Sequence, residues 1–166
     1  MIEFRKLTTN DGKDVFEMVQ EIGKGENGFT NSLYSDDFSL FQEKLHRNYE
    51  MSEGINLKPQ FVPQTIYWLY VDGKPVGYGK LRHYLNQHLL QHGGHIGYAI
   101  RPMDRGKGYA KILLKKLVQE SKEKQIDQLL LTCYESNEAS TKVIESNDGE
   151  LRDKKDGVCF YWIKIN

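Results

Sequence analysis

The segment RGKGYA, which runs from Arg105 to Ala110, places two glycines and two cations directly before an apolar-periodic run. The N-terminus of a helix exposes unpaired backbone N–H groups and a partial positive charge, and phosphates bind there readily. Gly106 and Gly108 let the backbone approach such an anion without a Cβ in the way. The cations Arg105 and Lys107 add charge at the rim. The segment therefore predicts a pyrophosphate site, although a plain helix-entry turn with solvated side chains fits the same residues.

Two common phosphate-binding folds do not match this segment. A P-loop requires Gly-Lys-Ser/Thr, whereas Lys107 is followed by Gly108. A dinucleotide-binding fold requires Gly-x-Gly-x-x-Gly, a later acidic residue and an all-parallel sheet. The hydrophobic patterns of this sequence predict a mostly antiparallel sheet, so a dinucleotide-binding fold is not expected either.

The elements that would position the segment are predicted from hydrophobic periodicity. Strands are expected at residues 2–7, on both sides of an Asp72-Gly73 turn, and at 95–102, 128–134, 150–152 and 158–165. Helices are expected at residues 15–22, 36–49, 108–124 and 137–147, and residues 51–64 are expected to form a polar loop. The predicted fold class is α/β (α+β), with a mixed, mostly antiparallel central sheet of about seven strands and about four flanking helices.

Composition narrows the class of protein. The 166 residues are 39% hydrophobic and 28% charged, which is typical of one globular domain, expected to span residues 1–166. Lys plus Arg and Asp plus Glu each total 23, so the net charge favours neither a nucleic-acid nor a membrane partner. Cys133 and Cys159 lie in apolar runs and are expected to be free, reduced thiols. With no signal-like or membrane-spanning run, we expect a cytoplasmic protein.

Residues 93–151 resemble the core of the GNAT superfamily of acyl-CoA-dependent N-acetyltransferases. The phosphate motif of that family, Arg/Gln-x-x-Gly-x-Gly/Ala, matches Arg105, Gly108 and Ala110. The Ile-Arg-Pro before the motif and the Asn-x-x-Ser after the next strand also match. The resemblance implies an acyltransferase that moves an acetyl group from acetyl-CoA, its co-substrate, to a primary amine by direct attack in a ternary complex.

The resemblance also implies roles for particular residues. One parallel β-α-β unit splays apart, and the pantetheine arm of acetyl-CoA pairs there with the backbone of Ala99, Ile100 and Arg101. The pyrophosphate is held by Arg105, Gly106, Lys107, Gly108, Tyr109 and Ala110. Asn137 and Ser140 contact the pantetheine or the nucleotide end. The amine, a small molecule or a peptide, enters from the opposite side, past the N-terminal helices.

The reaction needs a proton acceptor and a donor to the oxyanion. An alkyl amine has a pKa of about 10 and must lose a proton before it attacks. His95 is the predicted general base, because it begins the splayed strand where histone-acetylating members place a Glu, and an imidazole with a pKa of about 6.5 is largely neutral at pH 7. A packed His95, with water removing the proton, is the alternative. A backbone N–H near Ile100 is expected to bind the oxyanion.

The residue that usually donates a proton to the leaving thiolate in this family is absent from its expected position. Many members have a Tyr seven positions after the Asn, and here that position is Ile144. Tyr134 is the nearest phenol and the predicted donor, with a packing role as the alternative, and a thiolate with a pKa of about 8.5 can also leave unaided. Cys133 offers an acyl-cysteine route, or is a buried, inert thiol.

Alternative functions remain open from the sequence. A non-catalytic acyl-CoA sensor would keep the phosphate loop without a proton acceptor, and a partner-binding module would bind no CoA. His88, His92 and His95 have a zinc-like spacing, but two glycines interrupt the helix and no carboxylate or Cys completes the set, so no metal is predicted. The final strands offer an edge for a homodimer. The sequence does not name the amine.

Overall fold

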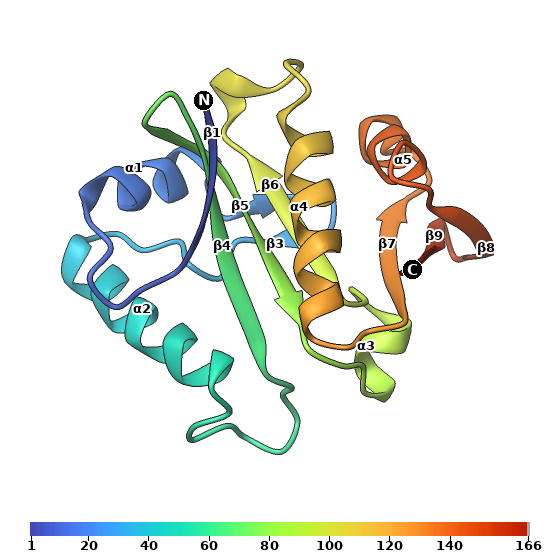
Figure 1. Cartoon of the computed structure of the whole chain (residues 1–166), viewed down its shortest axis with the longest axis horizontal. Helices are drawn as coiled ribbons and strands as arrows, with labels where there is room; N and C mark the ends of the chain where they lie inside the picture. The colour runs from blue at the N-terminus through green and yellow to red at the C-terminus, as the bar shows by residue number, and fades with distance from the viewer. Residues whose placement is uncertain (166) are drawn as a thin grey trace.

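A computed structural model describes residues 1–165 of the chain (Figure 1). In chain order the elements are β1 (Ile2–Lys6), α1 (Lys13–Ile22), β2 (Gly25–Glu26), β3 (Phe29–Thr30), α2 (Phe38–Ser52), β4 (Gln64–Val71), β5 (Lys74–Arg82), α3 (Gln87–Gln91), β6 (Ile96–Ile100), a 3-10 turn (Pro102–Asp104), α4 (Tyr109–Glu123), β7 (Gln128–Tyr134), α5 (Glu138–Glu145), β8 (Glu150–Lys155) and β9 (Val158–Lys164). The predicted mixed α/β class is confirmed. The strands β2 and β3 and the helix α3 were not predicted, because they are too short to show a hydrophobic period.

The strands form two larger sheets and a small hairpin. The first sheet has the order β1-β4-β5-β6, the second has the order β7-β9-β8, and β2 pairs only with β3. The two larger sheets together contain seven strands, but as separate ladders rather than as the one continuous sheet that was predicted. The Asp72-Gly73 turn joins β4 to β5 with both residues at positive φ, 49° and 79°, as a tight hairpin turn requires.

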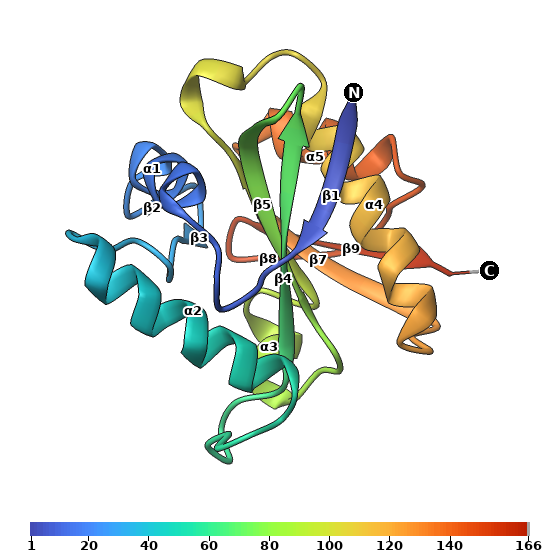
Figure 2. The same cartoon turned by 60° about the vertical axis from the view of Figure 1, so that its left-hand side comes forward.

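Helices cover both faces of the four-stranded sheet (Figure 2). The helices α1 and α2 pack on one face, where Trp68 and Tyr78 are buried, and α4 packs on the other. Gly79 permits the contact with α4, because a Cβ there would lie 2.6 Å from Leu117 Cδ1. Since side chains alternate along a strand, neighbouring residues of β5 serve opposite faces of the sheet.

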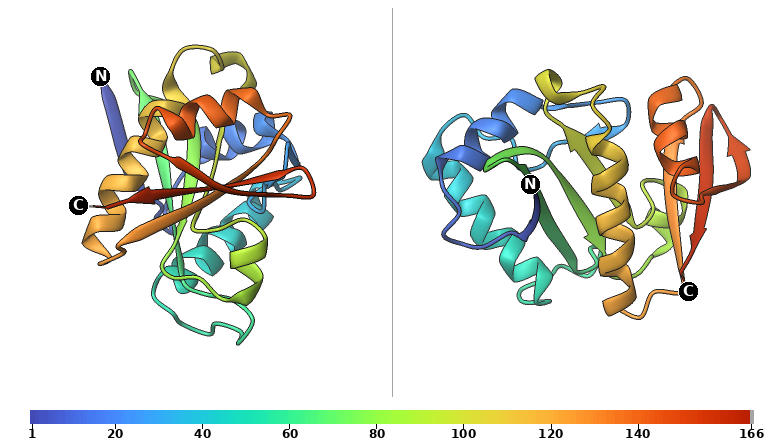
Figure 3. Two further views of the ribbon diagram at one scale, coloured as in Figure 1. Left: turned by 90° about the vertical axis from the view of Figure 1, so that its right-hand side faces the viewer. Right: turned by 45° about the horizontal axis from the view of Figure 1, so that its top comes forward.

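The helix α4 connects β6 to β7, which run in the same direction (Figure 1), as expected for the parallel β-α-β unit. Each of these strands is the edge of its own sheet, and they meet only at one end. There the His95 N–H donates to the Leu130 carbonyl at 2.8 Å, and Gly94 forms an isolated β-bridge with Leu131. Gly94 must be a glycine, because its φ is +61° and a Cβ would lie 2.3 Å from the Leu130 oxygen. The implied splaying of the two strands is therefore present, and the second sheet and α5 form a separate layer beside α4 (Figure 3).

Candidate active site

A cavity of about 770 Å³ lies between the edges of β6 and β7. The β2–β3 hairpin, β5, the 105–111 segment and α5 complete its wall. The predicted site residues that line it are Ala99, Ile100, Arg105, Gly106, Gly108, Tyr109, Ala110, Tyr134, Asn137 and Ser140. Arg101, Lys107 and His95 are not part of the wall that the described residues form. The fold thus brings most of the predicted residues to one cavity.

The glycine loop has the shape expected of an anion site. Gly106 and Gly108 have φ values of +79° and +85°, in the left-handed region that favours glycine. Gly108 is the N-cap of α4 and has no side-chain oxygen with which to cap the helix, so the first N–H groups of α4 are left for a ligand. A Cβ at either glycine would meet no described atom within 4 Å. Glycine is favoured at these two positions by the positive φ of the backbone and by the close approach that a bound anion would make.

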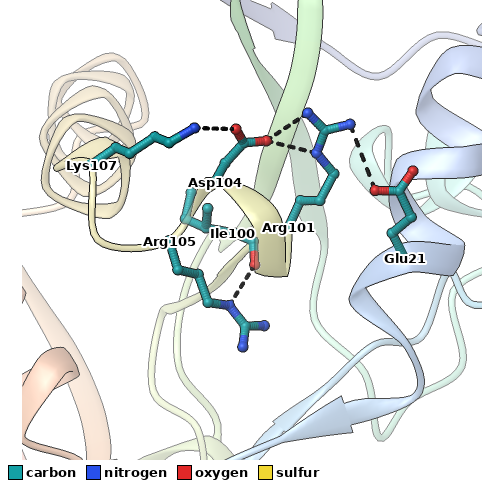
Figure 4. A network of polar contacts seen from close by, with 6 residues as sticks. All are labelled: Glu21, Ile100, Arg101, Asp104, Arg105 and Lys107. Carbon is teal, nitrogen blue, oxygen red and sulfur yellow. Dashed lines mark hydrogen bonds and ion pairs between the residues drawn. The ribbon is translucent and has the colours of Figure 1, made fainter.

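The side chains of Arg101 and Lys107 are held by Asp104 (Figure 4). The Asp104 carboxylate accepts from Arg101 Nε at 2.7 Å and from Lys107 Nζ at 3.2 Å. Arg101 also pairs with Glu21 of α1 at 3.6 Å. Burial alone would raise the pKa of Asp104, but the hydrogen bonds from Arg101 and Lys107 outweigh burial and lower it below its ordinary value. These two side chains thus hold the 3-10 turn against the glycine loop through Asp104.

Arg105 bridges the loop and the β2–β3 hairpin. Its Nε donates to the Ile100 carbonyl at 3.0 Å (Figure 4), and its guanidinium pairs with Glu26 of β2. Arg105 therefore fixes the end of β6 to the glycine loop, while its Nη1 pairs with Glu26, which also lines the cavity. A pyrophosphate at the loop would compete with Glu26 for this guanidinium.

Asn137 begins α5, as predicted. Its Oδ1 accepts a hydrogen bond from the Ser140 N–H at 3.2 Å, which makes it the N-cap. Ser140 Oγ in turn lies 3.0 Å from the hydroxyl of Tyr98 on β6. Burial raises the pKa of Tyr98 to about 12, so this phenol stays protonated. The pair links α5 to β6 across the cavity.

The geometry of His95 does not fit the predicted general base. The imidazole is only 5% exposed, and its Nδ1 accepts a hydrogen bond from the Leu130 N–H at 2.9 Å. A backbone N–H can donate only to an unprotonated nitrogen, so Nε2 carries the hydrogen and no ring nitrogen is left to accept a proton. Burial, with a smaller effect of Arg82, lowers the pKa of His95 to about 4. His95 instead ties β6 to β7 where the two strands meet.

Tyr134 and Cys133 lie at the end of β7. The Tyr134 side chain is 45% exposed and lies beside the β2–β3 hairpin, because a Cβ at Gly28 would lie 3.3 Å from Tyr134 Cζ. Cys133 is buried and lies 3.7 Å from Thr141 Oγ1, and burial raises the pKa of its thiol. The thiol form does not attack a thioester, so this environment favours the inert alternative. Cys133 and Cys159 are both free, as predicted.

The cavity-wall residues that sequence reasoning missed include Lys80 and Arg82 of β5, and Tyr98 of β6. A signal for the two cations was present, because they interrupt the glycine-rich and apolar strand VGYGKLR at alternate positions. Tyr98 gave no signal, because a Tyr within a short apolar strand is more often a packing residue.

The fold thus places a glycine loop, at the start of a crossover helix, at a cavity between two separated strands. Residues 29–148 match the model of the Acetyltransferase (GNAT) family. The chain therefore belongs to the GNAT acetyltransferase family and is an enzyme of the acyltransferase class. Comparison with curated protein sequences gave no match.

Solved structures of N-acetyltransferases have the same fold. The N-acetyltransferase PseH of Campylobacter jejuni in complex with acetyl coenzyme A is 14% identical, with a TM-score of 0.66 and 100% coverage of both chains. The putative acetyltransferase yncA of Salmonella typhimurium with acetyl-CoA is 14% identical, with a TM-score of 0.70 and coverage of 99% of this chain and 94% of the other. RimL, a ribosomal L7/L12 alpha-N-protein acetyltransferase in complex with coenzyme A, is 15% identical, with a TM-score of 0.75 and coverage of 99% and 94%. At these identities the likeness establishes the fold.

Metal-binding clusters and membrane spans were also sought in the described part of the chain. Residues 1–165 contain no group of three or more His, Cys, Asp or Glu side chains placed to hold a metal ion. None of their helices has the length and apolar character needed to cross a membrane.

Proposed function

We propose that the protein transfers the acetyl group of acetyl-CoA to a primary amine by direct attack in a ternary complex. The observation that carries this proposal is the cavity between the edges of β6 and β7, which ends at the glycine loop of α4. An elongated cofactor with an anionic end and a polar arm fits such a cavity. In this proposal the backbone of residues 106–110 binds the pyrophosphate, with Arg105 on the adjoining wall.

The exposed edge of β6 is suited to the pantetheine arm. The Arg101 N–H donates to the Val76 carbonyl of β5 at 2.7 Å. Because N–H directions alternate along a strand, the Ile100 N–H points away from β5, toward the cavity. By the same alternation Ala99 and Arg101 turn their N–H groups toward β5, so of the three predicted residues only Ile100 offers a backbone N–H to the cofactor at this edge. The Ile100 N–H is also the donor proposed for the tetrahedral oxyanion. Asn137 and Ser140 border the same channel from α5.

Proton transfer in this proposal does not involve His95. The ammonium of the acceptor first loses one proton to water in the open cavity, and its nitrogen then forms a bond to the thioester carbonyl carbon. The C–S bond breaks as the nitrogen loses its second proton. The exposed Tyr134 phenol is the proposed proton donor to the departing thiolate, and the second proton of the nitrogen restores the phenol. Tyr134→Phe should lower kcat without changing acetyl-CoA affinity, whereas a fall in affinity alone would assign Tyr134 to binding.

A panel of amines assayed for CoA release tests the proposal. We expect at least one class of amine to release CoA in proportion to acetylated product, and Gly108→Val to remove the activity. Release of CoA without acetylated amine would indicate thioester hydrolysis. Tight acetyl-CoA binding without turnover of any amine would favour the acyl-CoA sensor.

A further inference from the structure

Two cations on β5, Lys80 and Arg82, line the cavity and form no ion pair with any residue from 1 to 165. Lys80 is only 7% exposed, and its Nζ lies 3.3 Å from the Thr30 carbonyl and 5.2 Å from the centre of the Phe29 ring. Arg82 Nη1 donates to the Gly94 carbonyl at 3.0 Å. An unpaired charge is costly to bury, so these β5 cations call for an anion that the described chain does not supply.

The helices α1 and α2 cover one face of the four-stranded sheet (Figure 2), and the β5 cations lie on that face. Residues two apart on a strand share a face, and Tyr78, two residues before Lys80, packs among the residues of α1 and α2. Gly97 is the partner of Lys80 on β6, and a Cβ there would lie 3.1 Å from Lys80 Cε. The sequence therefore provides space for the lysine chain to cross β6 toward the cavity.

The carboxylates of the cavity wall already have partners. Glu26 pairs with Arg105, and Asp104 pairs with both Arg101 and Lys107. Among residues 1–165, the one lining cation outside these pairs at the glycine-loop end of the cavity is Lys111, which is exposed to solvent. The unpaired cations of this cavity wall with little exposure to solvent are the β5 cations.

The β5 cations are also distant from the proposed pyrophosphate site. Ile100, at the loop end of β6, pairs with Gly77, whereas Lys80 pairs with Gly97. Three residues along a strand correspond to about 10 Å. The cations also face α1 and α2, whereas the pyrophosphate site is at the start of α4, on the opposite face. The phosphates of the cofactor therefore do not neutralise the β5 cations.

We propose that Lys80 and Arg82 bind an anionic group of the acceptor, so that the acceptor is an amine that also carries a carboxylate or a phosphate. This inference rests on the proposed acetyl transfer, because it names the substrate class of the same site. A guanidinium fork binds carboxylate or phosphate through paired hydrogen bonds, and the lysine adds a compact charge. Burial, with a further effect of Arg82, lowers the pKa of Lys80 to about 8, which is consistent with a site that awaits an anion.

Matched pairs of amines test the proposal and distinguish the two anions. Ethanolamine is compared with its O-phosphate, and an amino acid is compared with its carboxamide, by kcat/KM for CoA release. We expect the anionic member of at least one pair to be preferred by about 10- to 100-fold, the range of one or two charge-assisted hydrogen bonds. The pair that shows the preference identifies the anion.

Variants connect the preference to the β5 cations. Lys80→Met keeps the length of the side chain and removes its charge, and it should reduce the preference by about 10-fold or more through the KM of the anionic amine. Lys80→Arg should retain most of the preference. Lys74→Met is the matched control, because Lys74 is an exposed lysine of the same strand. Acetyl-CoA affinity and thermal unfolding, measured for each variant, verify that the cofactor site and the fold are intact.

Equal kcat/KM within both pairs would overturn the subsite and leave acetyl transfer standing. An equal loss for both members of a pair in Lys80→Met would overturn it too, because Lys80 would then act on the reaction rather than on the anion. If no amine releases CoA, titration with inorganic phosphate and with succinate decides. Stabilisation of the wild type but not of Lys80→Met would support the subsite while acetyl transfer fails, and no difference between them would overturn both.

Discussion

Replacing His95 by asparagine should remove an acid-sensitive component of stability while leaving the junction of β6 and β7 intact. Asparagine is chosen because its Oδ1 can accept the Leu130 N–H that now donates to His95 Nδ1 at 2.9 Å. In the wild type, protonation of the ring abolishes that acceptor. The pKa of His95 is about 4 in the fold and about 6.5 when unfolded, so the unfolded chain binds more protons between these values.

The sign and the size of the effect follow from this difference. The contribution is fully present above a pH of about 6.5 and is lost progressively as the pH falls toward about 4. A shift of this size corresponds to a loss on the order of 3 kcal/mol of unfolding free energy. His83 has the same low pKa of about 4, caused by burial and by the charges of Lys124 and Lys6. Both histidines therefore add to the wild-type slope, and the difference between the wild type and His95→Asn isolates His95.

Urea unfolding at a series of pH values between 7 and 4 measures this slope. We expect His95→Asn to be less acid-sensitive than the wild type, and His95→Leu to lose about 1–3 kcal/mol even at pH 7, because it leaves the Leu130 N–H unpaired. An identical pH dependence in the wild type and His95→Asn would refute the low pKa of His95 in the folded protein. A 10²- to 10⁴-fold fall in kcat in a stably folded His95→Asn, an effect of about the size of general-base assistance, would restore His95 as the base.

Three further substitutions test the site. Gly108→Val should abolish acetyl-CoA binding in a titration and cost about 1–3 kcal/mol in thermal denaturation, because a branched side chain is strained at positive φ; wild-type affinity in the folded variant would remove the phosphate-loop assignment. Asn137→Ala should lose about 1 kcal/mol with its helix cap and should also weaken acetyl-CoA binding, whereas a stability loss with unchanged affinity would leave only the capping role. Tyr98→Phe should cost about 1 kcal/mol through the lost contact with Ser140, and unchanged stability in urea would show that this hydrogen bond contributes nothing.

The local patterns of the sequence were sufficient for the longer helices and strands and for the position of the glycine loop at the start of α4. The 128–134 strand was predicted at its observed bounds, because a continuous apolar run of that length has few other solutions. The Asp72-Gly73 turn was equally clear, since only a tight hairpin uses that pair between two apolar runs. The loop at residues 105–110 was predicted from its two glycines and from the helical periodicity of the apolar residues that follow them.

The remaining features depend on long-range contacts that periodicity does not record. His95 was predicted as a base because its type and position fitted, but the hydrogen bond that occupies Nδ1 comes from Leu130, thirty-five residues away. The contact between β6 and β7 at Gly94 and His95 joins residues distant in sequence, and the role of the β5 cations became apparent only when the fold placed them against the cavity wall. The role of each of these residues depends on its burial, and the burial of a residue is determined by the packing of the whole fold.

Amide hydrogen exchange with and without saturating acetyl-CoA tests the central claim most directly, because it reports where the cofactor binds. The account predicts that acetyl-CoA slows the exchange of residues 106–110 and of Ile100 on the free edge of β6, while the amides of β1 and β4 change little. Stoichiometric binding with no slowing at the glycine loop or at the edge of β6, or no binding at all, would contradict the account.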